Sequence, residues 1–129
     1  MKYLKGGDDV DRDAWVARIT ASCQAAGTYR TWFDDIITTL ADILAMRDEA
    51  RELFVESGGN IVVDHTNKAG ATNLEQNPIL RMVNDLNRDA LAYWRDLGLT
   101  PAGLKKIDQQ SMKQRKKSAF AEVLKGVGG

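Results

Sequence analysis

The stretch GGNIVVDHTNKAGATNLEQNP, residues 58–78, interrupts the helical pattern that dominates the rest of the chain. Gly58-Gly59 is a typical helix stop, and residues 60–66 are rich in the β-branched side chains that favour a strand. Residues 67–70 are a turn signal, and residues 71–74 can return as a second short strand. Because an isolated two-stranded hairpin is only marginally stable in water, we expect this one to lie on the helices or on another subunit.

Three helical segments flank this hairpin, at residues 11–26, 31–57 and 77–97. The middle segment repeats apolar residues at helical spacing, namely Phe33, Ile36, Ile37, Leu40, Ile43, Leu44, Ala50, Leu53 and Phe54. Asn77-Pro78 is a good helix start, and Thr100-Pro101 opens a further helical turn toward Ile107. A helix over residues 31–57 would be on the order of 40 Å long, whereas a domain of this size has a radius of gyration of about 14 Å. We therefore expect that helix to project or to pack against a neighbouring chain.

These patterns predict a mainly α fold with two or three long helices and a small β-hairpin at about residues 60–74. We expect a flexible N-terminus over residues 1–10, a helical oligomerisation core over residues 11–107 and a basic C-terminal tail over residues 108–129. No apolar run approaches the roughly 20 residues that a membrane span needs, and the first residues do not resemble a secretion signal. The single cysteine, Cys23, cannot form an internal disulfide, which fits a reducing compartment such as a bacterial cytoplasm.

Charge is neutral overall but sorted along the chain. There are 18 basic and 18 acidic side chains, with 7 basic and 11 acidic in residues 1–57 but 7 basic and 2 acidic in residues 105–129. A neutral protein with a basic end can bind an anionic partner locally. The alternative is a solvated, flexible tail whose charge only keeps it soluble.

Three motifs occur in a distinctive order and spacing. They are the run from Asn67 to Asn73, the pair Asn77-Pro78, and Leu97-Gly98-Leu99-Thr100-Pro101 one helix later. Together with Gly27-Thr28-Tyr29 before the long helix, this order resembles one family of phage terminase small subunits, over roughly residues 12–107. The resemblance implies a subunit of a closed homo-oligomeric ring, without catalytic residues or cofactors. It also implies binding of viral double-stranded DNA and recruitment of the large terminase subunit, the ATPase and nuclease, in the host bacterial cytoplasm.

Two groups of cations are candidate DNA contacts, because binding to DNA requires cations that match phosphates. The first group lies at the start of the C-terminal region and consists of Lys105, Lys106, Lys113, Arg115, Lys116 and Lys117. The second group is Arg81, Arg88 and Arg95, whose seven-residue spacing aligns them on one stripe of a helix. Asp85 is within helical reach of both Arg81 and Arg88, so a solvated face of ordinary ion pairs is the alternative for this stripe.

The C-terminal region ends in a short apolar group. Phe120, Val123 and Leu124 follow helical spacing in an otherwise polar stretch. They are candidates for docking into a groove on the large subunit. Capping of this protein's own core is the alternative.

The remaining residues with chemical potential favour structural roles. His65 is the only histidine and is distant in sequence from Cys23, so we expect no metal site. Gly58-Gly59 lacks the Lys-Ser/Thr of a phosphate-binding loop, and Asp34-Asp35 has no His or Cys partner for acid–base or nucleophilic work. Core or interface packing is expected for the tryptophans, Trp15, Trp32 and Trp94, with base stacking as an alternative for Tyr93 and Trp94.

Two other classes of function compete with a DNA-packaging subunit. One is a helical protein–protein adaptor without DNA binding, in which the C-terminal region is the docking peptide. The other is a small nuclease, which would need a cluster of metal ligands that the sequence does not offer.

Overall fold

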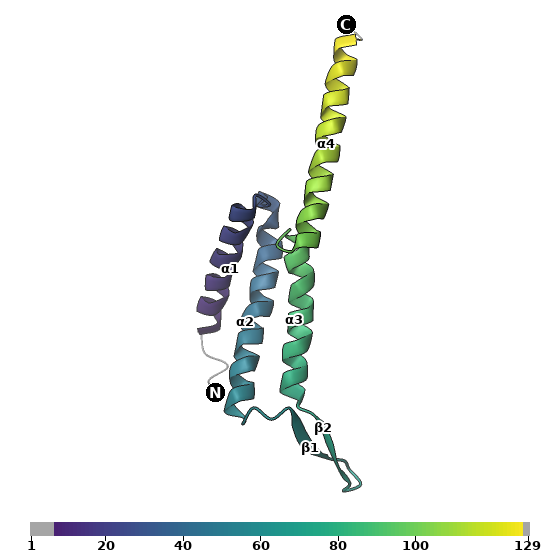
Figure 1. The fold of residues 1–129 in the computed structure, drawn as a ribbon. Helices are drawn as coiled ribbons and strands as arrows, with labels where there is room; N and C mark the ends of the chain where they lie inside the picture. Colours follow the sequence, from purple (N-terminus) through teal and green to yellow (C-terminus); the bar gives the residue numbers. More distant parts are fainter. Residues whose placement is uncertain (1–6, 128–129) are drawn as a thin grey trace.

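The computed structural model describes residues 7–127 as a helical protein with one β-hairpin (Figure 1). The elements in chain order are α1 (Gly7–Ala26), the short 3-10 helix η2 (Thr31–Phe33), α2 (Asp34–Glu56), β1 (Val62–Thr66), β2 (Thr72–Gln76), α3 (Pro78–Asp96) and α4 (Pro101–Val127). The expected mainly α fold with a small hairpin is confirmed. Of the segment expected to be flexible, residues 1–6 lie outside the described residues, and residues 7–10 form the first turn of α1.

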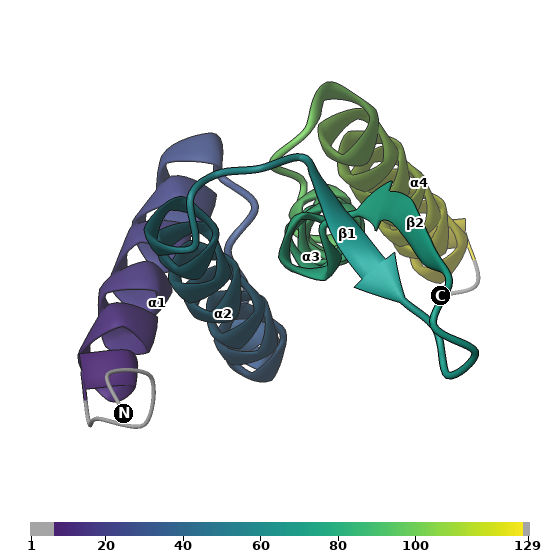
Figure 2. The ribbon, with the colours of Figure 1, turned by 90° about the horizontal axis from the view of Figure 1, so that it is seen from below.

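The core lies between α1, α2 and α3. The middle helix, α2, packs against both of the others, and Figure 2 shows the three side by side when viewed along their length. The buried apolar side chains of this core are Ile19, Cys23, Phe33, Ile37, Leu40, Ala41, Leu44, Ala90 and Leu97. Trp15 on α1 also ties to α2, because its indole N–H donates to the carboxylate of Asp48 at 2.8 Å. The apolar core follows from the helical spacing of apolar residues, which aligns them on one face of each helix.

The hairpin extends beyond the ends of α2 and α3 (Figure 1). Its antiparallel register pairs Val62 with Gln76 and Thr66 with Thr72. The Asn67 side-chain oxygen accepts hydrogen bonds from the backbone N–H groups of Ala69 and Ala71, each at 3.0 Å, which fixes the turn. Nearly every strand residue is exposed. The hairpin was expected to lie on the helices or on another subunit, and the first of these alternatives is wrong for the described chain.

A tight corner joins α3 to α4. Gly98 ends α3 with φ +73°, and the Thr100 hydroxyl caps α4 by accepting from the Gly103 N–H at 3.1 Å. The first turn of α4 comes so close to α3 that a Cβ at Gly103 would collide with the carbonyl oxygen of Arg95. This contact sets the direction in which α4 leaves the core.

The C-terminal region forms one long helix. We expected a helical turn toward Ile107 followed by a tail, but α4 continues without a break to Val127. Residues 108–125 contain neither glycine nor proline and consist mostly of good helix formers, so nothing in this stretch ends the helix. Every residue from 112 to 127 is exposed, so this half of α4 packs on nothing else in the described chain. Among residues 7–127, no helix combines the length and apolar character needed to cross a membrane.

Candidate nucleic-acid interface

Cations dominate the exposed half of α4. The helix carries seven basic and two acidic side chains. All six cations expected to contact DNA are exposed, and none of them forms an ion pair within the part of the chain that the structure describes. Their charges are therefore available to an external anion.

Five of these six cations share one side of α4. At about 100° per residue, the side chains of Lys105, Lys106, Lys113, Lys116 and Lys117 project within an arc of about 120°. From Lys105 to Lys117 the helix rises roughly 18 Å. Arg115 lies outside this arc. We call the five lysines the α4 lysine face.

The arginines of α3 are also exposed and lie along one stripe. Arg81, Arg88 and Arg95 follow each other at seven-residue intervals on the side of α3 opposite the buried Val83 and Ala90. We call these three residues the arginine stripe. Arg88 pairs with Asp85 at 3.3 Å, in a contact in which both side chains are more than half exposed. The expected pairing of Asp85 with Arg81 does not form, so among the described residues Arg81 and Arg95 have no ion-pair partner.

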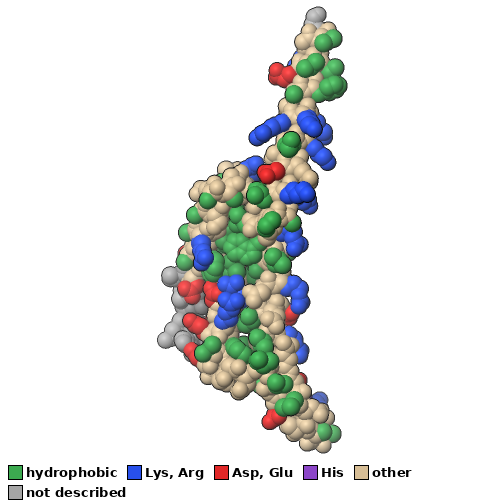
Figure 3. Space-filling model, in the orientation of Figure 1, with side chains coloured by type: hydrophobic (Ala, Val, Ile, Leu, Met, Phe, Trp, Pro, Cys, Tyr) green, Lys and Arg blue, Asp and Glu red, His purple; other side chains and the backbone are tan. Residues whose placement is uncertain are grey.

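Both groups of cations contribute to one edge of the molecule. Figure 3 shows lysine and arginine side chains along the right-hand side, over α3 and onward over α4. Acidic side chains concentrate instead on α2, which carries seven acidic and two basic residues. The molecule is therefore electrically polar across its width, although its net charge is zero.

Beyond the lysine face, α4 becomes apolar on the same side. Phe120, Val123 and Leu124 are 66%, 62% and 55% exposed, and with Val127 they fall within the same arc as the lysines. We call these four residues the distal apolar stripe. The alternative that Phe120, Val123 and Leu124 cap the protein's own core is wrong, because α4 carries them away from it (Figure 1). An exposed apolar row of this kind is typical of a helix that docks into a partner.

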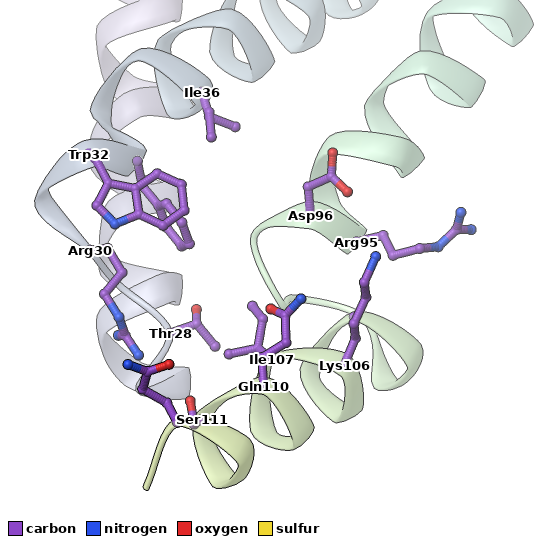
Figure 4. Close-up of a pocket in the computed structure, with 13 residues that line it drawn as sticks. Thr28, Arg30, Trp32, Ile36, Arg95, Asp96, Lys106, Ile107, Gln110 and Ser111 are labelled. Carbon is purple, nitrogen blue, oxygen red and sulfur yellow. The ribbon is translucent and has the colours of Figure 1, made fainter. Parts of the chain in front are cut away.

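A cavity of about 580 Å³ lies at the corner between the helical core and α4. Figure 4 shows Trp32 and Ile36 on one side and Ile107, Gln110 and Ser111 of α4 on the other. Arg30 and Lys106 add positive charge to the lining. Asp96 adds one negative charge, and the described lining contains no histidine or cysteine, so its mixture of apolar and mainly basic groups suits a partner segment better than a reacting substrate.

Sequence reasoning missed this cavity, because it placed all three tryptophans in packing roles. Trp15 is partly buried beneath the guanidinium groups of Arg18 and Arg47, whose carbons lie 4.9 and 5.6 Å from the ring centre. Trp94 and Tyr93 pack against the core. Trp32 is 69% exposed, so packing in this chain's own core is wrong for this residue, and packing at an interface stays a prediction. Its apolar neighbour Phe33 takes the buried position instead, in line with the helical spacing that relates Phe33 to the buried Ile37 and Leu40.

The other titratable candidates have structural surroundings. His65 lies on the exposed hairpin, where its Nδ1 is 3.6 Å from the Glu75 carboxylate. Cys23 is buried, and this burial raises the pKa of its thiol. The hydroxyl of Tyr29 donates to the Asp34 carboxylate at 2.7 Å, which raises the pKa of the tyrosine. Within residues 7–127, no three His, Cys, Asp or Glu side chains are grouped closely enough to hold a metal ion.

Comparison with known proteins gives one match. A protein-family model described as phage terminase, small subunit, matches residues 12–114. The matched region runs from α1 into the first half of α4 and includes the cavity and the arginine stripe. No curated protein and no solved structure matches the chain.

Proposed function

We propose, since this chain belongs to the phage terminase small-subunit family, that it holds viral double-stranded DNA on the α4 lysine face and brings that DNA to the large terminase subunit. Membership of the family places the chain in phage DNA packaging, and small subunits of this kind are generally the non-catalytic part of a terminase. The host cytoplasm, where packaging takes place, is the expected site of action.

The observation that carries the proposal is a set of five lysines on one side of an exposed helix, which have no ion-pair partner among residues 7–127. The B-DNA major groove is wide enough to admit an α-helix, and its walls are lined by phosphates. Lysine side chains are long enough to contact such phosphates from the helix surface, without reading base sequence. DNA held in this way would be bound through its charge and shape.

The distal apolar stripe is the proposed docking site for the large subunit. It follows the lysine face along the same side of the same helix, so a protein bound there would be held next to the DNA. Apolar side chains at three- and four-residue steps suit a hydrophobic groove. The two proposed contacts thus follow one another along α4, with DNA nearer the core and the large terminase subunit nearer the C-terminal end.

Self-assembly completes the proposal. One copy presents a single lysine face of five cations. Several copies in a closed homo-oligomer would present the lysine face repeatedly, and avidity would raise the overall affinity for DNA well above that of one copy. Identical copies can close into a ring through one repeated kind of contact, whatever their number. We therefore propose a ring.

The test is the salt dependence of DNA binding. Replacing Lys113 and Lys116 by glutamine removes two cations from the lysine face. We expect the affinity for a duplex of arbitrary sequence to fall, and the slope of log affinity against log salt to decrease by about 1–2 for each copy bound. Fluorescence anisotropy across a salt series measures both quantities.

A matched control removes the same number of cations from other parts of the molecule. Lys68→Gln with Arg51→Gln removes one cation from the hairpin turn and one from α2, and should leave the slope unchanged. Equal effects of the two double variants would reject α4 as the DNA surface. Absence of DNA binding at every salt concentration would favour the adaptor function, in which α4 contacts protein alone.

A further inference from the structure

A second charged stripe runs along α2. Asp35, Asp42, Glu49 and Glu56 follow each other at seven-residue intervals. Seven residues make almost two helical turns, so these carboxylates form a line with steps of roughly 10 Å. The line lies on the side of α2 opposite the buried Leu40 and Leu44 and therefore points away from the core. We call these four residues the acidic stripe; the arginine stripe of α3 has the same spacing and also points away from the core.

The two stripes lie at matching levels along the molecule. Arg47 on α2 donates to the Asn87 side chain on α3 at 3.3 Å, and Ile36 lines the same cavity as Arg95 and Asp96. Because α2 and α3 run in opposite directions, the Arg47–Asn87 contact places Asp42 between the levels of Arg88 and Arg95, and the shared cavity places it nearer Arg88; Asp42 thus lies within about one helical turn of the level of Arg88. The same alignment places Asp35 within about one turn of the level of Arg95, and Glu49 within about one turn of the level of Arg81.

We propose that the acidic stripe of one copy docks against the arginine stripe of the next copy of this chain. The inference rests on the self-assembly in the proposed function and specifies its interface. Cyclic symmetry rotates a subunit without translating it along the axis. Around an axis parallel to the helices, neighbours therefore keep the same levels, and Asp35, Asp42 and Glu49 face Arg95, Arg88 and Arg81.

The ion pairs that these stripes form within one subunit can be replaced by pairs between subunits. The Arg88–Asp85 pair is highly exposed, and Asp42 reaches Arg12 only at 3.9 Å. Glu49 and Glu56 also have interactions within the chain. The exposed Arg88–Asp85 and Asp42–Arg12 pairs hold their partners weakly, so a neighbouring stripe can replace or share them. Apolar contact is available as well, because Met46 within the acidic stripe is 50% exposed and Leu91 beside the arginine stripe is 48% exposed.

The pairing is heterologous, because the two stripes are different surfaces of one subunit. A dimer formed in this way leaves one stripe of each kind uncovered, so addition of copies continues until a ring closes. Complementary charge then determines orientation and register more than total affinity. The arginine stripe would face a neighbouring subunit, and the α4 lysine face would remain open to DNA.

Charge reversal tests the pairing. Native mass spectrometry of the full chain should show the wild type as one assembled species. Asp42→Arg and Arg88→Glu each place like charges opposite one another, so each should raise the concentration for half-assembly at least about tenfold. The double variant Asp42→Arg with Arg88→Glu restores opposite charges and should recover the wild-type mass. Asp35→Arg with Arg95→Glu provides a second pair should either variant of the first fail to fold.

Control measurements separate this inference from the proposed function. Lys113→Glu on the lysine face should leave the assembled mass unchanged while weakening DNA binding. A monomeric wild type would overturn both self-assembly and the stripe pairing. An assembled wild type whose mass is insensitive to both reversals would overturn the pairing alone. If Arg88→Glu assembled normally but lost DNA affinity, the arginine stripe would be a DNA surface, and the pairing would again be overturned.

Discussion

At the scale of single residues, the position of α4 depends on a glycine. Gly103 lies in the first turn of α4, where that helix crosses the end of α3, and the backbone carbonyl of Arg95 occupies the space that a Cβ would need. Thr100 caps the same turn. The approach of backbone to backbone is closer here than any other residue type allows. The placement of α4 relative to the core is therefore decided by the absence of one side chain.

Replacing Gly103 by alanine should force α4 away from α3. We expect a loss of about 1–3 kcal/mol in the free energy of unfolding, measured by urea denaturation. The control is Gly126→Ala on the same helix, where nothing lies within 4 Å of the added Cβ. That change should be neutral or slightly stabilising, because alanine favours a helix over glycine. Equal stabilities for the two variants would show that the crossing tolerates a side chain.

At the scale of elements, α4 differs from the other helices because half of it lacks a packing partner. Helices α1, α2 and α3 bury one face in a shared core, whereas residues 112–127 are exposed on all sides. An isolated helix of this length is only marginally stable in water. The exposed apolar side chains at its end would gain stability from burial in a partner. This element therefore combines a positively charged face, the proposed DNA surface, with an exposed apolar end.

The distal apolar stripe should respond to truncation of its side chains. Phe120→Ala with Leu124→Ala removes most of its apolar surface, so binding to the large terminase subunit should weaken by about 2–4 kcal/mol, as measured by calorimetry. Glu122→Ala is a matched control on the other side of the helix and should have little effect. DNA binding by the double variant should remain near that of the wild type, because its cations are intact. Unchanged affinity for the large subunit would place the docking site elsewhere.

At the scale of the whole molecule, the folded core and the functional helix are separable. All the core side chains lie between Ile19 and Leu97, and the last partly buried residue of α4 is Ser111. The charge is distributed in the same way, with the acidic excess on α2 and the basic excess on α4. The subunit is therefore a small stable body carrying an exposed arm, and its stability and its binding are expected to depend on different residues.

Deleting residues 112–129 should leave the stability of the core intact. Thermal unfolding followed by circular dichroism should keep its midpoint within roughly 2 °C, since the described part of the deleted segment buries nothing in the core. DNA affinity should fall sharply, because Lys113, Lys116 and Lys117 are removed. A large drop in the unfolding midpoint would indicate that the distal half of α4 packs against other copies in the native assembly.

Local sequence patterns determined most of the secondary structure of this protein. The Asn67 turn, the Asn77-Pro78 start and the Gly98-to-Pro101 corner all act through neighbours a few residues away, so they could be interpreted without a structure. The length of α4 was missed because its second half has no core-facing apolar period, although its composition favours a helix. The candidate cations and the distal apolar side chains could also be identified from sequence, because their spacing is itself local.

Only the tertiary structure decided which distant residues meet. It exposes Trp32 and buries Phe33, it forms a cavity between the core and α4, and it brings Gly103 against Arg95. The seven-residue spacing of the acidic stripe was present in the sequence, but its level relative to the arginine stripe follows from the packing of α2 on α3. The physical reason is range: helix and turn propensities act over a few residues, whereas the mutual placement of helices is determined by close packing of side chains far apart in the chain.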